Sequence, residues 1–223
     1  MSGSRDAILG RIRGSLGRGA VTGTEREVVE ARLQDRPRGI IPARSDRDKK
    51  GQIDLFVEMA ESVAASINRV PTTDAVPDAV GDYLARHNLG ANVRMAPDSW
   101  LEGIDWTQRP TVAITKGPSD GTDEVSVTAA FAGIAETGTL FLHSGPSSPT
   151  TLNFLPENHI VVLRTSQIVG PYEDAWDLLR HAGKMPRTVN MITGPSRTGD
   201  IEQTIMLGAH GPRRLHIIIV DDG

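Results

Sequence analysis

Five short runs of apolar residues divide the second half of this 223-residue chain, and each has the length of a buried strand. The runs are nearly continuous rather than alternating with polar residues. A strand of that kind is covered on both faces, which is typical of a parallel sheet. The five runs cover residues 111–114, 139–142, 160–163, 189–192 and 215–220.

Helical patterns occur before these runs and between them. One stripe of apolar residues at helical spacing is formed by Ile53, Phe56, Ala60, Val63 and Ile67. Pro77 and Gly90 have the residue types that begin and end a second helix, and a third stripe lies between Ile168 and His181. Strands that alternate with helices predict an α/β fold, in which helices flank a mostly parallel sheet.

The uneven distribution of charge along the sequence predicts that the chain has two parts. Residues 1–50 hold 12 Lys and Arg against 7 Asp and Glu, whereas residues 51–223 hold 12 against 21. The polar stretch 36–51 is the expected linker, so we expect an N-terminal helical arm over 1–50 and one domain over 51–223. The arm carries a helical pattern up to Leu16 and a capping-box pattern at Thr24 and Glu27. Its short helices are expected to fold back on the domain or to pack on another chain, either a partner or a second copy. A membrane surface is the least favoured alternative, because the apolar face of the basic helix lacks Trp and Phe.

Composition excludes several classes of function. No cysteine is present, so this chain can hold neither an iron–sulfur cluster nor a Cys-ligated zinc ion. His143 and His159 lack metal-ligand spacing, no G-x-G-x-x-G motif occurs, and the net charge of −4 argues against nucleic-acid binding. We therefore expect no metal and no cofactor in this chain. Neither a membrane span nor a signal-peptide core is recognisable, and the expected location is the cytoplasm.

Three polar segments, each beside a predicted strand, are candidates for chemistry. In the first, Gly138 allows the backbone to expose N–H groups, and Thr137 and Thr139 add hydroxyls, a combination that suits an anion. Glu136 in the same segment is a candidate base or nucleophile. The alternative for this segment is an ordinary hydrogen-bonded turn with a solvated glutamate.

The second segment places a guanidinium, Arg197, between the hydroxyls of Ser196 and Thr198. Asp200 could orient Arg197 or a substrate hydroxyl, and the Gly-Lys-Ser/Thr ending of a Walker A loop is missing. The alternative is a surface turn with a local Arg–Asp pair.

The third segment places His210 before Gly211, among small residues that leave the imidazole accessible. His210 is the second candidate catalytic residue, as an acid, a base or an anion contact. The alternative is a histidine that hydrogen-bonds the backbone. If all three segments lie at one edge of a sheet, their side chains converge on one cleft for a carboxylate or phosphate.

These segments, in this order, resemble the LUD-domain family. The matching residues are Ile134–Thr139, Leu155–Ile160, Ser196–Glu202 and Gly208–Pro212. The resemblance covers roughly residues 51–223, and Gly199 departs from it, because the family usually has alanine there. It implies a fold like that of ribose-5-phosphate isomerases, glucosamine-6-phosphate isomerases and CoA transferases.

The resemblance also implies a role in oxidising L-lactate to pyruvate, beside two partner proteins that carry iron–sulfur clusters. It assigns no catalytic step to this chain, so whether the chain is itself an enzyme stays open. The first interpretation is therefore a non-redox subunit that binds a small anion. The alternatives are a free-standing isomerase or CoA-transferase-like enzyme with Glu136 as base or nucleophile, and a scaffold without a ligand.

Overall fold

The computed structural model describes residues 2–19, 21–198 and 206–222. Contacts divide the chain into two compact units, residues 1–40 and 41–223. The first unit holds α1 (Ser2–Ser15) and α2 (Gly23–Asp35), whose apolar side chains Ile8, Ile12 and Leu33 are exposed. The unit boundary thus precedes the expected one between Lys50 and Gly51.

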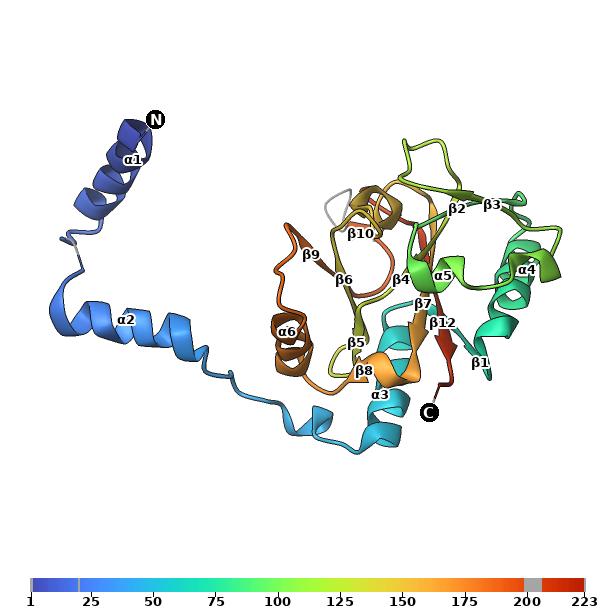
Figure 1. The fold of residues 1–223 in the computed structure, drawn as a ribbon, viewed down its shortest axis with the longest axis horizontal. Helices are drawn as coiled ribbons and strands as arrows, with labels where there is room; N and C mark the ends of the chain where they lie inside the picture. Colours follow the sequence, from blue (N-terminus) through green and yellow to red (C-terminus); the bar gives the residue numbers. More distant parts are fainter. Residues whose placement is uncertain (1, 20, 199–205, 223) are drawn as a thin grey trace. The chain divides into compact units, whose positions relative to one another are not determined.

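A six-stranded parallel sheet is the centre of the second unit (Figure 1). Its strand order is β1-β12-β7-β4-β2-β3, and every neighbouring pair is parallel. The strands are β1 (Ser66–Val70), β12 (Arg214–Val220), β7 (Asn158–Arg164), β4 (Val125–Ala129), β2 (Asn92–Met95) and β3 (Ala113–Lys116). The expected α/β class with a mostly parallel sheet is confirmed.

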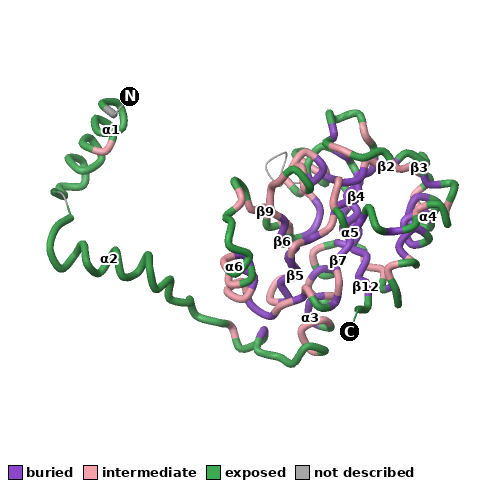
Figure 2. Tube along the Cα trace, in the orientation of Figure 1, coloured by how far each residue is buried: buried purple, intermediate pink, exposed green. Residues whose placement is uncertain are grey.

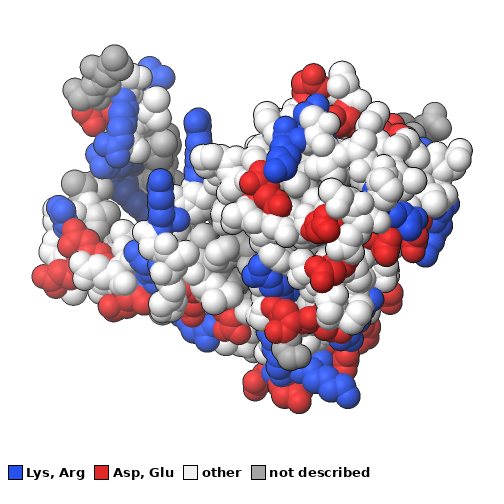
Figure 3. Space-filling view, turned by 45° about the vertical axis from the view of Figure 1, so that its right-hand side comes forward, with Lys and Arg blue, Asp and Glu red and all other residues white. Residues whose placement is uncertain are grey.

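The central strands of this sheet are buried on both faces, as the continuous apolar runs predict, whereas β3, expected from the run at 111–114 to be a buried strand, lies at the edge of the sheet and is largely exposed. Ile160 and Ile218 pack against α4 (Val76–Arg86) and α5 (Ser99–Glu102), whereas Val161 and Ile217 face α3 (Lys49–Ser62). Figure 2 shows the buried residues concentrated along β4, β7 and β12. On the face in Figure 3, acidic and basic side chains are interspersed over the domain.

A second sheet covers the α3 side and has four strands in the order β8-β5-β6-β9. They are β8 (Ile168–Val169), β5 (Ala132–Ile134), β6 (Thr139–His143) and β9 (Val189–Ile192), and α6 (Tyr172–His181) packs on the outer face. The runs at 139–142 and 189–192 belong to β6 and β9, which pair antiparallel. They are apolar because α3 and α6 enclose this sheet, so continuous apolarity did not mean parallel pairing there.

Short elements complete the fold. These are the 3₁₀ turns at Ala43–Ser45, Thr73–Ala75, Trp106–Gln108, Thr150–Asn153 and Thr165–Gln167, and the hairpin of β10 (Arg197–Thr198) and β11 (Met206–Leu207).

Two local predictions are wrong. Ile67 lies in β1 rather than on a helix, because α3 ends at Ser62 and Ala64 adopts a left-handed φ of 68°. The second helix begins at Gly23 after Thr22, whose side chain makes no capping bond, so Thr24 lies inside the helix and does not cap it.

Deleting residues 1–50 should lower the free energy of unfolding of the second unit by about 2 kcal/mol or more below that of a chain lacking only residues 1–40. The longer deletion removes Asp48, whose carboxylate accepts the Gly51 N–H at 2.9 Å and caps α3. It also removes Lys49, whose Nζ donates to the carbonyls of Ser166 and Ile168. Urea unfolding of both truncated chains is the measurement, and equal stability of the two would contradict the boundary at Ile40.

Candidate functional site

The chain reverses its direction across the six-stranded sheet between β2 and β4. From β2 it crosses to β3 on one side, and from β4 it returns through the second sheet to β7 and β12 on the other. In open α/β sheets, ligands bind outside the carboxyl ends of the strands at such a switch point.

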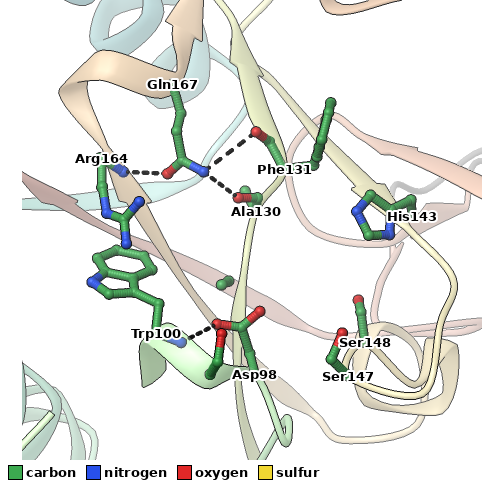
Figure 4. Close-up of a pocket in the computed structure, with 11 residues that line it drawn as sticks. Asp98, Trp100, Ala130, Phe131, His143, Ser147, Ser148, Arg164 and Gln167 are labelled. Atoms are coloured by element: carbon green, nitrogen blue, oxygen red, sulfur yellow. Dashed lines mark hydrogen bonds between the residues drawn. The ribbon is translucent and has the colours of Figure 1, made fainter. Parts of the chain in front are cut away.

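A cavity of about 270 Å³ lies at that place (Figure 4). Its walls come from the segments that follow β2, β4, β6 and β7, so we call it the switch-point cavity. The lining residues are Asp98, Ser99, Trp100, Ala129, Ala130, Phe131, His143, Ser147, Ser148, Arg164 and Gln167.

Arg164, the last residue of β7, supplies the cation of this cavity. Its guanidinium carbon lies 3.9 Å from the centroid of the Trp100 ring, so the planar group is stacked on the indole (Figure 4). The stacking holds the guanidinium in place and leaves its N–H groups free along the edge. Within the described residues, no carboxylate lies within ion-pair distance of Arg164.

Two polar side chains fix the same wall. Oδ1 of Asp98 accepts the backbone N–H groups of Trp100 at 2.9 Å and Leu101 at 3.3 Å, which caps α5. The side-chain oxygen of Gln167 accepts the backbone N–H of Arg164 at 2.9 Å, and its side-chain nitrogen donates to the Ala130 carbonyl at 3.0 Å. Gln167 therefore ties the end of β7 to the end of β4, while Oδ2 of Asp98 makes no hydrogen bond to the described residues.

His143, Ser147 and Ser148 lie across the cavity from Arg164 (Figure 4). His143 ends β6, and its ring lies 5.1 Å from that of Phe131. The serines belong to a tight turn in which Gly145 and Ser148 exchange two backbone hydrogen bonds of 3.2 and 3.0 Å. The cavity thus joins one cation to hydroxyl, imidazole and carboxylate groups, a set that suits a small organic acid carrying a hydroxyl.

The first predicted segment forms the β5–β6 turn, and its threonine hydroxyls hydrogen-bond to each other and to neighbouring hydroxyl groups. Thr139 Oγ1 lies 2.6 Å from Thr137 Oγ1, 2.6 Å from Thr193 Oγ1 and 3.0 Å from the Tyr172 hydroxyl. Gly138 has the positive φ that the sequence suggested. Glu136 is partly buried and donates its backbone N–H to the Gly170 carbonyl.

The second and third segments adjoin each other. The Ser196 N–H donates to the Pro212 carbonyl at 2.9 Å, and Ser196, His210 and Gly211 line a cavity of about 220 Å³, which we call the loop cavity. Arg197 is exposed, and its guanidinium donates to the Val63 carbonyl at 2.6 Å. Thr198 pairs with Met206 in the β10–β11 hairpin.

The three segments therefore lie near one another, but the expected single cleft is not among the cavities described. Glu136, Thr137, Thr139 and Arg197 line neither the switch-point cavity nor the loop cavity, and Asp200 lies outside the described residues. The residues that sequence reasoning missed are Arg164, Trp100 and Asp98, which stand in no recognisable motif and meet only through the fold.

The described residues contain neither a candidate metal site nor a candidate membrane span. No group of three or more His, Asp or Glu side chains there is arranged to hold a metal ion. Likewise, none of the helices in residues 2–19, 21–198 and 206–222 is long and apolar enough to cross a membrane.

Comparison with known proteins supports the expected family resemblance. Residues 120–220 match the LUD domain, so the resemblance to the LUD-domain family that the sequence indicates is confirmed over this part of the chain. An uncharacterized protein of Neisseria meningitidis is 40% identical over 99 residues, which cover 44% of this chain and 42% of that protein. Lactate utilization protein C of Geobacillus kaustophilus is 30% identical over 153 residues, which cover 66% of this chain and 62% of that protein.

The fold has a relative of known structure. A DUF162 family protein from Deinococcus radiodurans superposes with a TM-score of 0.57 at 19% identity, over 78% of this chain and 99% of that one. This similarity supports the α/β fold alone. The chain spans between 42% and 62% of the length of the two curated relatives named above.

Proposed function

We propose that this chain takes part in lactate utilization in the cytoplasm, as a non-redox subunit that binds a small 2-hydroxycarboxylate in the switch-point cavity. The names of several relatives, such as lactate utilization protein C of Geobacillus kaustophilus, support the metabolic role. The ligand class is drawn from the cavity.

The observation that carries the ligand class is Arg164, a stacked guanidinium that lines a cavity and forms no ion pair with a described carboxylate, although Asp222 interacts with it electrostatically. A partly buried guanidinium whose N–H groups make no ion pair is favourable only if a ligand or water replaces its hydration. The fork of a guanidinium matches the two oxygens of a carboxylate. Oδ2 of Asp98, which has no hydrogen-bond partner among the described residues, can accept a hydrogen bond from the 2-hydroxyl group of the ligand. His143 and Ser148 lie on the opposite wall of the cavity.

The redox chemistry belongs to partner proteins in this proposal. The 223 residues contain no cysteine, and the clusters of iron–sulfur proteins are held by cysteine thiolates. Residues 1–40 are the proposed contact with such a partner, because Ile8, Ile12 and Leu33 are exposed there. No observation favours the isomerase or CoA-transferase alternative, since Glu136 lines neither described cavity.

Replacing Arg164 by glutamine should raise the dissociation constant of L-lactate by about 10- to 100-fold, the effect of losing a charge-assisted hydrogen bond. Isothermal titration calorimetry of the full chain measures this constant. Arg197→Gln is the matched control, because Arg197 is exposed and donates to the Val63 carbonyl. Propionate, which lacks the hydroxyl, should bind the unaltered chain more weakly than L-lactate does.

Two results would overturn the proposal. One is that Arg197→Gln weakens L-lactate binding and Arg164→Gln does not. The lactate site would then lie at the loops predicted from sequence. The other is that L-lactate does not bind, or binds no better than propionate.

A further inference from the structure

The loop cavity differs from the switch-point cavity in the chemistry of its lining. It lies at the amino ends of β7 and β12, where the Ser196 and His210 segments meet the chain that precedes β7. Its lining residues are Asn153, Phe154, His159, Met191, Ile192, Gly194, Pro195, Ser196, His210, Gly211, Pro212 and Leu215.

Asn153 forms part of this cavity with no internal partner for its side chain. The residue is only 1% exposed, and neither Oδ1 nor Nδ2 has a hydrogen-bond partner among the described residues. A buried primary amide without partners is unfavourable, because both its acceptor and its donors have lost water. A molecule in the cavity can satisfy this donor–acceptor pair when the Asn153 side chain turns toward it.

His159 adds a second buried group to the same cavity. Its Nε2 lies 2.8 Å from Thr128 Oγ1, whereas Nδ1 has no partner in the described chain. Complete burial lowers the pKa of His159 to about 3, so the ring is neutral at physiological pH. Depending on its tautomer, Nδ1 offers one further neutral donor or acceptor.

Most of the remaining lining is apolar, and none of the described lining residues carries a fixed charge. Phe154 and Met191, 43% and 39% exposed, contribute large apolar side chains, and Leu215 adds a buried one. Among the described lining residues, the titratable side chains are His159 and His210. A compact anion would find no permanent cation here, whereas a neutral molecule with an apolar body would find matching surface.

We propose that the loop cavity is a second binding site, for a neutral molecule with a flat apolar body and a carboxamide-like end. Its amide pairs with the side chain of Asn153, its body packs between Phe154, Met191 and Leu215, and Nδ1 of His159 takes a further hydrogen bond. This site is separate from the proposed lactate site, with which it shares no lining residue.

Benzamide and benzoate test the ligand class, because they share a ring and differ in amide against carboxylate. Titration of the full ¹⁵N-labelled chain should shift the side-chain NH₂ signals of Asn153 with benzamide. Benzoate should bind at least about tenfold more weakly. Asn153→Leu, which keeps the volume and removes the amide, should weaken benzamide binding by about tenfold or more.

Two further variants keep the test decisive. Met191→Ala alters only a partly exposed wall and should weaken benzamide binding severalfold even if Asn153→Leu does not fold. Arg164→Gln should leave benzamide binding unchanged, which separates this proposal from the lactate site. The proposal is overturned if benzoate binds as tightly as benzamide. It is equally overturned if benzamide leaves Asn153 unshifted up to its solubility limit, because ordered water would then be the natural occupant.

Discussion

Replacing Gly138 by alanine should lower the free energy of unfolding by about 3–5 kcal/mol, which could prevent folding altogether. Gly138 has a φ of 64°, and a Cβ there would lie 2.2 Å from the backbone nitrogen of Ala60 in α3. Neither atom can move without separating the β5–β6 turn from the helix. The added carbon therefore combines left-handed strain with a backbone collision.

Gly183→Ala is the matched control, measured with Gly138→Ala by urea unfolding. Gly183 has a φ of 79°, but a Cβ there would meet nothing within 4 Å. Alanine at Gly183 should therefore cost only about 1–2 kcal/mol, the penalty of the left-handed conformation. If both variants lost the same free energy of unfolding, the close packing of the β5–β6 turn against α3 would be contradicted.

Lowering the pH from 7 to 4.5 should destabilise the domain by about 5 kcal/mol through two buried histidines. Burial lowers the pKa of His159 to about 3, and burial followed by the charges of Arg86 and His87 lowers that of His216 to about 4. In the unfolded chain both rings titrate near pH 6.5, so the unfolded state binds more protons below that value. The contribution to stability is therefore complete above pH 6.5 and is lost as the pH falls toward the folded-state pKa values.

The slope of unfolding free energy against pH tests this assignment. Between pH 6 and 5 the unaltered chain should lose about 2.4 kcal/mol, about 1.2 for each histidine, because the unfolded-state rings are not yet fully protonated in this range. His159→Gln and His216→Gln should each halve that slope, whatever they do to stability at pH 7. An unchanged slope in either variant would show that the corresponding ring is not buried in its neutral form.

The run at 160–163 was found because its strand is apolar on both faces, whereas the run at 111–114 marked β3, an edge strand that is largely exposed. Val161 and Leu163 face α3 while Ile160 and Val162 face α4, so the run at 160–163 was visible without tertiary information. β4 was missed because it carries Ser126 and Thr128, two buried polar residues. Ser126 Oγ donates to the Leu152 carbonyl at 2.7 Å, and Thr128 pairs with His159, which are compensations that only the fold reveals.

The candidate site was less predictable than the fold. The principle that a guanidinium at a strand end binds a carboxylate led to Arg197, because hydroxyls and glycines surround it in the sequence. Arg164 follows an apolar strand without any motif. Trp100 comes to lie against the guanidinium of Arg164 only because the chain crosses over the sheet after β2. The Ser196 and His210 segments line one cavity without the Glu136 segment that the sequence placed beside them, and the buried group that distinguishes that cavity, Asn153, comes from a loop the sequence did not single out.

A crystal structure of the full chain grown with L-lactate is the most direct test of the central claim. We predict lactate in the switch-point cavity, with its carboxylate hydrogen-bonded to the guanidinium of Arg164 and its hydroxyl directed to Asp98. Lactate bound instead beside Arg197 or in the loop cavity, with the Arg164 edge facing only water, would contradict the account.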